Sequence, residues 1–210
     1  MPDNIRLIFA KTGRARFISH LDLMAVFQRA FYRAQLPLRY SQGFNPHAYV
    51  SIAFPLSVGQ AGTAEILDFG VTAPVDLEAL PGCLNALLPE GITVRSAELN
   101  GRSCKEVVWA SVELFFETTA APEDFLSLFT QPLIVEKRSK KGSKPTDLLP
   151  MIRSYRCEAT SGGLKCHMEL AAQNPTLNPE YIVKAFCERI GESPTSITRT
   201  GLLDAEGQPF

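Results

Sequence analysis

Hydrophobic periodicity along the first hundred residues constrains the fold more than any single motif. Apolar and polar residues alternate in some segments, which is typical of strands, and apolar residues recur every three or four positions in others, which is typical of helices. The predicted strands are residues 5–9, 49–54, 64–71 and 92–99, and the predicted helices are residues 20–35 and 76–88. This β-α-β-β-α-β order is the split-βαβ pattern of a ferredoxin-like domain.

The same order of elements recurs in the second half of the chain. The predicted strands are residues 107–117, 153–160, 164–170 and 196–201, with an additional strand at 133–137, and the predicted helices are residues 122–130 and 179–190. Gly101-Arg102-Ser103 is the predicted boundary between the halves. We therefore expect an α+β protein of two tandem ferredoxin-like domains with antiparallel sheets, residues 1–100 and 104–210.

Composition is that of a folded chain with an uneven distribution of charge. Of the 210 residues, 45% are hydrophobic and 20% are charged, as in ordinary globular proteins. The formal net charge is -1, but residues 1–50 hold seven Lys or Arg against two Asp, which gives +5. The N-terminal quarter is therefore expected to attract an anionic partner.

Several function classes lack their motifs in this sequence. It contains no P-loop, G-x-G-x-x-G, G-x-S-x-G or HExxH pattern, which favours binding over autonomous catalysis. Its five cysteines are odd in number and show no C-x-x-C spacing, which argues against a disulfide framework, a zinc site and an iron–sulfur cluster. No charged-then-apolar leader and no apolar run of about 18 residues is present. We expect a cytoplasmic protein with no membrane segment and no cofactor.

The stretch S19-H-L-D22 opens the helix predicted at residues 20–35. Ser19 and Asp22 can cap the first-turn amides, which by itself explains both residues. His20 lies at the same end, where unpaired amides and the helix dipole favour anions, and Arg14 and Arg16 come just before it. A phosphate bound at this end would explain the three basic residues.

Further cations lie along this helix and after it. Arg29 and Arg33 share a face because they are four residues apart, and Arg39 follows the helix. They form either a solvated basic face over an ordinary core helix or a strip that tracks a phosphate backbone.

The stretch S41-Q-G-F-N-P-H47 predicts a turn, because Gly43 permits a positive φ and Asn45 precedes Pro46. Phe44 is either a plug into the core or a platform on which a base stacks. Turn formation leaves His47 unexplained.

His20 and His47 could act together as acid and base, or bind a metal with Asp22. The second arrangement is a weak metal signal at these spacings, so we predict no metal ligands.

The strand predicted at residues 64–71 carries two carboxylates that cannot pair. Glu65 and Asp68 fall on opposite faces, since side chains alternate along a strand. Asp68 shares its face with Ile66 and is expected either to pair with an N-terminal arginine or to lie at a solvated edge.

Segment 138–145 concentrates basic residues between small and turn-forming ones. Its cations are Arg138, Lys140, Lys141 and Lys144. This composition predicts a mobile basic loop.

The stretches K11-T-G-R-A-R-F-I-S-H-L-D-L-M24, Y40-S-Q-G-F-N-P-H47 and A64-E-I-L-D68 resemble the bacterial family called radical SAM-linked proteins. The resemblance covers essentially the whole chain, and K140-K-G-S-K-P-T-D-L148 resembles a second, basic block of the family. The family occurs as free-standing proteins and as C-terminal extensions of some radical SAM enzymes, and it has no established activity. The resemblance implies a partner or substrate-presenting module for a radical SAM enzyme, since the chain lacks a C-x-x-x-C-x-x-C motif.

The leading hypothesis is an RNA-binding accessory module without independent enzymatic activity, in which Phe44 stacks a base that His20 and Asn45 contact. The predicted nucleic-acid-binding residues are Arg14, Arg16, Arg29, Arg33, Arg39, Phe44, Asn45, Lys140, Lys141 and Lys144. One alternative is an enzyme acting on a phosphodiester or nucleotide through His20 and His47. Another is a module that binds only other proteins.

Overall fold

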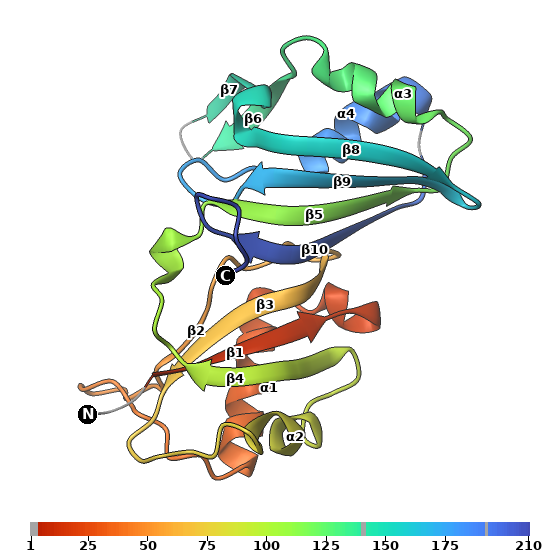
Figure 1. Cartoon of the computed structure of the whole chain (residues 1–210). Helices are drawn as coiled ribbons and strands as arrows, with labels where there is room; N and C mark the ends of the chain where they lie inside the picture. Colours follow the sequence, from red (N-terminus) through yellow and green to blue (C-terminus); the bar gives the residue numbers. More distant parts are fainter. Residues whose placement is uncertain (1–3, 140–141, 192) are drawn as a thin grey trace. The chain divides into compact units, whose positions relative to one another are not determined.

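In the computed structural model, which describes residues 4–139, 142–191 and 193–210, the chain divides into two units, Met1–Glu106 and Val107–Phe210 (Figure 1). Each unit combines helices with strands that pair antiparallel, so the protein has a mixed α+β fold. No helix in the described part of the chain is long and apolar enough to cross a membrane.

The first unit contains every helix and strand expected in the first hundred residues. Its elements are β1 (Asn4–Lys11), the 3-10 helix η1 (Gly13–Phe17), α1 (His20–Arg33), β2 (Val50–Ile52), β3 (Ala61–Gly70), α2 (Leu80–Asn85), β4 (Ile92–Leu99) and the 3-10 helix η2 (Cys104–Glu106). The strands lie in the order β4-β1-β3-β2, and all three pairings are antiparallel.

Alternation along β1 explains which face of this sheet is covered. Leu7 and Phe9 point to the same side, since they are two residues apart, and both belong to the core together with residues of α1 and α2. Phe9 packs edge-on against Phe27 of α1, with the ring centroids 4.9 Å apart. Both helices therefore cover one face of the sheet, as Figure 1 shows.

Helix α2 is shorter than the expected 76–88 because a capped turn precedes it. Asp76 Oδ1 accepts hydrogen bonds from the backbone amides of Glu78 and Ala79, at 3.0 and 3.1 Å. Pro81 then lies in the first turn of α2, where its missing N–H leaves no helical bond unmade.

An ion pair occupies the opposite face of the first sheet. Arg6 and Asp68 are directly opposed on β1 and β3, and Asp68 accepts hydrogen bonds from Arg6 Nε and Nη2, both at 2.8 Å. This confirms the expected pairing of Asp68 with an N-terminal arginine. The hydrogen bond to Asp68 raises the pKa of Arg6, so the guanidinium stays charged.

The second unit repeats the order of elements and inserts a hairpin. Its main elements are β5 (Trp109–Phe116), α3 (Pro122–Leu126), β6 (Ile134–Ser139), β7 (Gly142–Asp147), β8 (Ile152–Thr160), β9 (Gly163–Ala171), α4 (Glu180–Ile190) and β10 (Thr195–Leu203), with the short 3-10 helices η3 (Ser127–Phe129) and η4 (Leu149–Met151). The strand order is β10-β5-β9-β8. Phe186 of α4 packs on Phe116 and Phe125, with centroid distances of 4.9 and 5.1 Å.

The prediction of a mobile basic loop at residues 138–145 is wrong, because most of this segment lies in the antiparallel hairpin of β6 and β7. Pro145 lies opposite Glu136 in a sheet of only two strands. A proline without an N–H is tolerated there because each strand has one unpaired edge. Lys140 and Lys141 lie outside the described residues.

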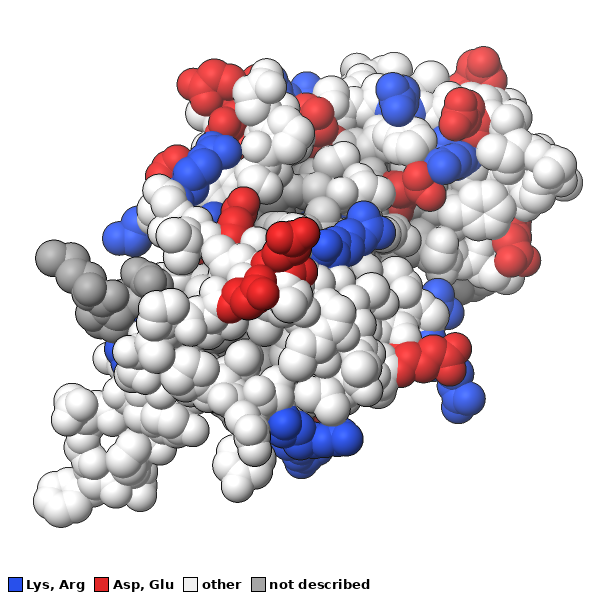
Figure 2. Space-filling model, turned by 60° about the horizontal axis from the view of Figure 1, so that its bottom comes forward, with Lys and Arg blue, Asp and Glu red and all other residues white. Residues whose placement is uncertain are grey.

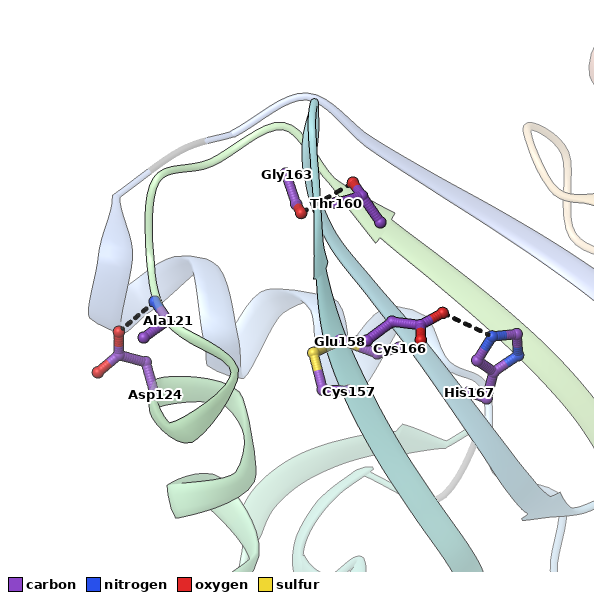
Figure 3. The surroundings of a disulfide bond; sticks show 8 residues. All are labelled: Ala121, Asp124, Cys157, Glu158, Thr160, Gly163, Cys166 and His167. Atoms are coloured by element: carbon purple, nitrogen blue, oxygen red, sulfur yellow. Dashed lines mark hydrogen bonds and ion pairs between the residues drawn. A yellow bond between two sulfur atoms is a disulfide. The ribbon is translucent and has the colours of Figure 1, made fainter.

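The second unit also contains a disulfide, between Cys157 and Cys166 (Figure 3). These cysteines are directly opposed on β8 and β9, on either side of the turn at residues 161–162. The expectation that the cysteines form no disulfide is therefore wrong for this pair. Beside them, His167 lies 3.9 Å from Glu158 and 3.8 Å from Glu113.

Candidate functional site

The segment after α1 folds into a closed loop whose ends are joined by Ser41 and His47. Ser41 Oγ lies 2.9 Å from His47 Nδ1 and accepts a hydrogen bond from the His47 amide at 3.1 Å. The Ser41 amide in turn donates to the His47 carbonyl at 2.9 Å. His47 therefore has a structural role in closing the loop, which the turn rules alone did not explain.

Phe44 lies in this loop, and its side chain is fully exposed, at 107% of the reference area. The interpretation of Phe44 as a plug into the core is therefore wrong. Asn45 is exposed as well, so both residues are accessible to a ligand.

A hollow of about 660 Å³ lies between the outer face of α1 and this loop. Arg29, Arg33 and Tyr32 line it from the helix, and Tyr40 and His47 line it from the loop. Both arginines are exposed, and the tyrosines are 80% and 49% exposed. None of the described residues that line it is acidic, so the two arginines make its charge positive, and two tyrosines form part of its walls.

A second hollow of about 320 Å³ adjoins the first through His47 and Ala48, which line both. Its cation is Arg39, whose guanidinium lies 4.6 Å from the centroid of the Tyr49 ring and donates to Asn4 Oδ1 at 2.8 Å. On its other side the guanidinium lies so close to Gly70 that a Cβ there would be 2.7 Å from Arg39 Nε. Arg39 is therefore held in place between an aromatic ring and the backbone of β3.

The beginning of α1 is capped as expected. Ser19 is the N-cap residue, and its Oγ accepts a hydrogen bond from the Asp22 amide at 3.2 Å and donates to the Asp22 carboxylate at 2.7 Å. Arg14 is exposed on η1, and Arg16 lies over the Phe17 ring at 4.8 Å from its centroid.

His20 lines a small cavity of about 10 Å³ with Lys11 and Glu65, a combination that the sequence analysis missed. Lys11 and Glu65 are each only 1% exposed, and the Nδ1 atom of His20 is buried without a hydrogen-bond partner among the described residues. The alternation that buries Phe9 also buries Lys11, two residues later, and would have indicated its position. The volume is that of about one water molecule, so the cavity cannot admit a substrate.

The structure does not bring His20 and His47 to one site. They line different cavities, and no hydrogen bond in the described part of the chain joins them. It does bring Arg29, Arg33 and His47 together, with Arg39 in the adjoining hollow. Lys144 lies in the second unit, on β7.

Charge on the surface is local. Figure 2 shows a face on which Lys and Arg are interspersed with Asp and Glu over a mostly uncharged surface. The chain as a whole carries a formal charge of -1. Attraction of an anion would therefore depend on the hollow itself and not on a broad positive field.

Comparison with known proteins identifies the family. Residues 4–179 match the family described as "Uncharacterized protein conserved in bacteria (DUF2344)". The chain belongs to this family. No curated protein matches this chain. One solved structure, "Crystal Structure of an Unknown Protein from Galdieria sulphuraria", is 12% identical and covers 95% of this chain and 99% of its own, with a TM-score of 0.30. A likeness at this score carries no argument about function.

Proposed function

We propose that the protein is an RNA-binding accessory module in which α1 and the loop after it form the binding surface. The observation that carries the proposal is the hollow in which Arg29 and Arg33 lie beside Tyr32, Tyr40 and His47 without an acidic neighbour. Exposed arginines one helical turn apart can contact neighbouring phosphates, and exposed aromatic rings beside them can stack on bases.

The charge of the hollow favours a polyanion as the ligand and differs from that of an ordinary solvated helix face. An ordinary solvated helix face carries both signs of charge, whereas the two arginines here have no acidic partner in the described structure. The adjoining hollow adds Arg39, and its one carboxylate among the described residues, Asp68, is already in an ion pair with Arg6. The binding surface would thus extend over three arginines.

Salt dependence of RNA binding tests this proposal. Fluorescence anisotropy with a labelled oligoribonucleotide is expected to show affinity that falls steeply as salt rises. The double variant Arg29→Ala/Arg33→Ala is expected to bind more weakly and to reduce the slope of log K against log [salt] by about 1.4, because about 0.7 counterion is released per single-strand phosphate contact.

The matched control removes two exposed arginines that do not line the hollow, Arg95 and Arg156. Arg95→Ala/Arg156→Ala changes the net charge by the same amount and is expected to keep the wild-type slope. No detectable binding at low salt, or equal slopes for the two double variants, would exclude RNA binding at this surface.

We also propose, from the family resemblance, that the module serves a radical SAM enzyme as an accessory or substrate-presenting partner. The support is the resemblance of the S19-H-L-D22 and G43-F-N-P-H47 blocks and the lack of a cluster-binding motif in this chain. Co-purification of a radical SAM enzyme that survives nuclease treatment would support a direct contact, and loss of the enzyme on nuclease treatment would show that RNA alone links them.

Each unit is proposed to be a ferredoxin-like domain. The support is that both units follow the β-α-β-β-α-β order once the β6–β7 hairpin is set aside. In each, the last strand lies beside the first, which lies beside the third and then the second. An experimental structure in which either sheet has another strand order would exclude this assignment.

A further inference from the structure

The proposed function leaves open whether the polynucleotide is single or double stranded. The side chains that line the hollow beside α1 favour a single strand. Resting on that proposed function, we infer that the ligand is a single-stranded polynucleotide whose unpaired bases stack on Tyr32 and Tyr40 while its phosphates contact Arg29 and Arg33. The argument depends on the exposure, spacing and shape of these side chains.

The first step is the exposure of the aromatic rings. Tyr32 is 80% exposed and Tyr40 49% exposed, and they line the same hollow from two different segments, α1 and the loop after it. Most of the area of Tyr32 and about half of that of Tyr40 stays in water, so this exposed aromatic area contributes little to folding. They offer exposed aromatic surface to a ligand from both segments.

The second step is the alternation of charge and ring on α1. Arg29 lies three residues before Tyr32 and four before Arg33, so it neighbours both on the helix surface, and all three side chains line the hollow. A duplex keeps its bases stacked on each other and presents mainly phosphates and groove edges. It therefore has no free base face to stack on an exposed ring. A single strand offers both a phosphate and a free base face at each nucleotide.

The third step is size and continuity. A volume of about 660 Å³ is within the range of sites that hold one drug-sized molecule, about 300–1,000 Å³, which is the size class of a single nucleotide. The hollow adjoins the one that holds Arg39, since His47 and Ala48 line both, so a strand that extends beyond the first would reach the second. The Ser41–His47 hydrogen bond holds His47, one of the two residues that line both hollows.

The experiment compares three labelled probes with the whole chain: an oligouridylate of ten nucleotides, an oligodeoxythymidylate of the same length and a ten-base-pair RNA duplex. The single strands are expected to bind at least about 10-fold more tightly than the duplex. Tighter binding of the oligouridylate would show that the ligand is RNA, and equal binding of the two single strands would show that the protein does not distinguish ribose from deoxyribose. Both results support the inference.

The rings are tested by Tyr32→Leu/Tyr40→Leu, with Tyr32→Phe/Tyr40→Phe as the conservative variant. Loss of stacking is expected to weaken single-strand binding by at least about 10-fold, because each base–aromatic stack is worth about 1–3 kcal/mol, while the salt slope stays unchanged. The Phe variant is expected to bind as the wild type does. Phe17→Leu removes an exposed ring outside the hollow and is the matched control, with no expected change.

The outcomes separate this inference from the proposed function. If the duplex binds as tightly as the single strands, or if the Leu variant keeps wild-type affinity, the inference fails although RNA binding stands. If no probe binds at low salt, both fail. Competition by polyglutamate as effective as by oligouridylate, with no effect of the Leu variant, would overturn the inference in favour of an acidic protein partner.

Discussion

Replacement of Asp68 by Asn isolates the contribution of the ion pair on the face of the first sheet opposite the helices. The Asp68 carboxylate accepts two hydrogen bonds from Arg6 at 2.8 Å and one from Asn100 Nδ2 at 2.9 Å. The side chain of Arg6 is 3% exposed and that of Asp68 is 23% exposed. Asn has nearly the same shape, but one of its two terminal groups is a donor that faces another donor.

The expected loss is about 3 kcal/mol in the free energy of unfolding of the first unit. Removing one partner of a buried pair costs about 3–5 kcal/mol, and the partial exposure of Asp68 places this pair at the lower end. Trp109, the single tryptophan, lies on β5 of the second unit, so its fluorescence reports on the wrong part of the chain. Amide hydrogen exchange of β1 and β3 reports on the first unit and is expected to become roughly 150-fold faster.

The matched control is Glu98→Gln, on the strand at the other side of β1. Glu98 lies opposite Arg6 in the β1–β4 register but is exposed. The substitution Glu98→Gln therefore removes the same charge as Asp68→Asn without taking away a buried acceptor. Its exchange rates are expected to change by less than about 5-fold, the range of a surface charge pair. Equal effects of the two substitutions would refute the reasoning, because they would show that the pair acts as ordinary surface charge.

Three further predictions concern the cysteines and Arg39. Burial raises the pKa of the Cys104 thiol, so at pH 8 less of it is thiolate, and iodoacetamide is expected to alkylate exposed Cys83 first; faster labelling of Cys104 by mass spectrometry would contradict this. Titration of the unreduced, denatured chain is expected to find three thiols, and five after reduction; five before reduction would exclude the disulfide of the second unit. Gly70→Ala is expected to push Arg39 off the ring that it covers and to cost about 1 kcal/mol, visible as a shift of its Nε–Hε resonance in NMR spectra; an unmoved resonance would contradict the contact.

Local periodicity was enough to predict most of the fold. Strand β4 has the predicted bounds, Ile92–Leu99, and α1 begins at the predicted residue because Ser19 caps it and apolar residues recur at helical spacing. These signals lie within one element, so they can be read without knowing its partners. The β6–β7 hairpin could not be predicted in the same way, because its basic and proline-containing sequence is typical of a loop and only the pairing of two strands makes it regular.

The candidate site was predicted in part. The cations of α1 were found from their four-residue spacing, and the hollow brings them together with His47. Tyr32 and Tyr40 were not predicted as site residues. The exposure of Tyr32 could have been predicted, because it lies next to Arg33 on the polar side of α1. The Ser41–His47 bond depends on side-chain geometry that spacing does not determine.

Two other differences have simple causes. The charge of Lys11 concealed its place on the buried face of β1, where strand alternation puts it with Phe9. The count of five cysteines argued against a disulfide. The predicted turn at residues 161–163 was also one residue too long, so it did not place Cys157 opposite Cys166, whereas the observed turn at residues 161–162 does.

Photo-cross-linking tests the central claim most directly, because it identifies the surface that contacts a single strand. An oligoribonucleotide containing 4-thiouridine is irradiated with the whole chain at low salt, and cross-linked peptides are identified by mass spectrometry. We predict cross-links within residues 25–49, concentrated at Tyr32 and Tyr40, that are lost in the Arg29→Ala/Arg33→Ala variant. Cross-links confined to residues 107–210, or none under conditions in which the probe binds, would contradict the account.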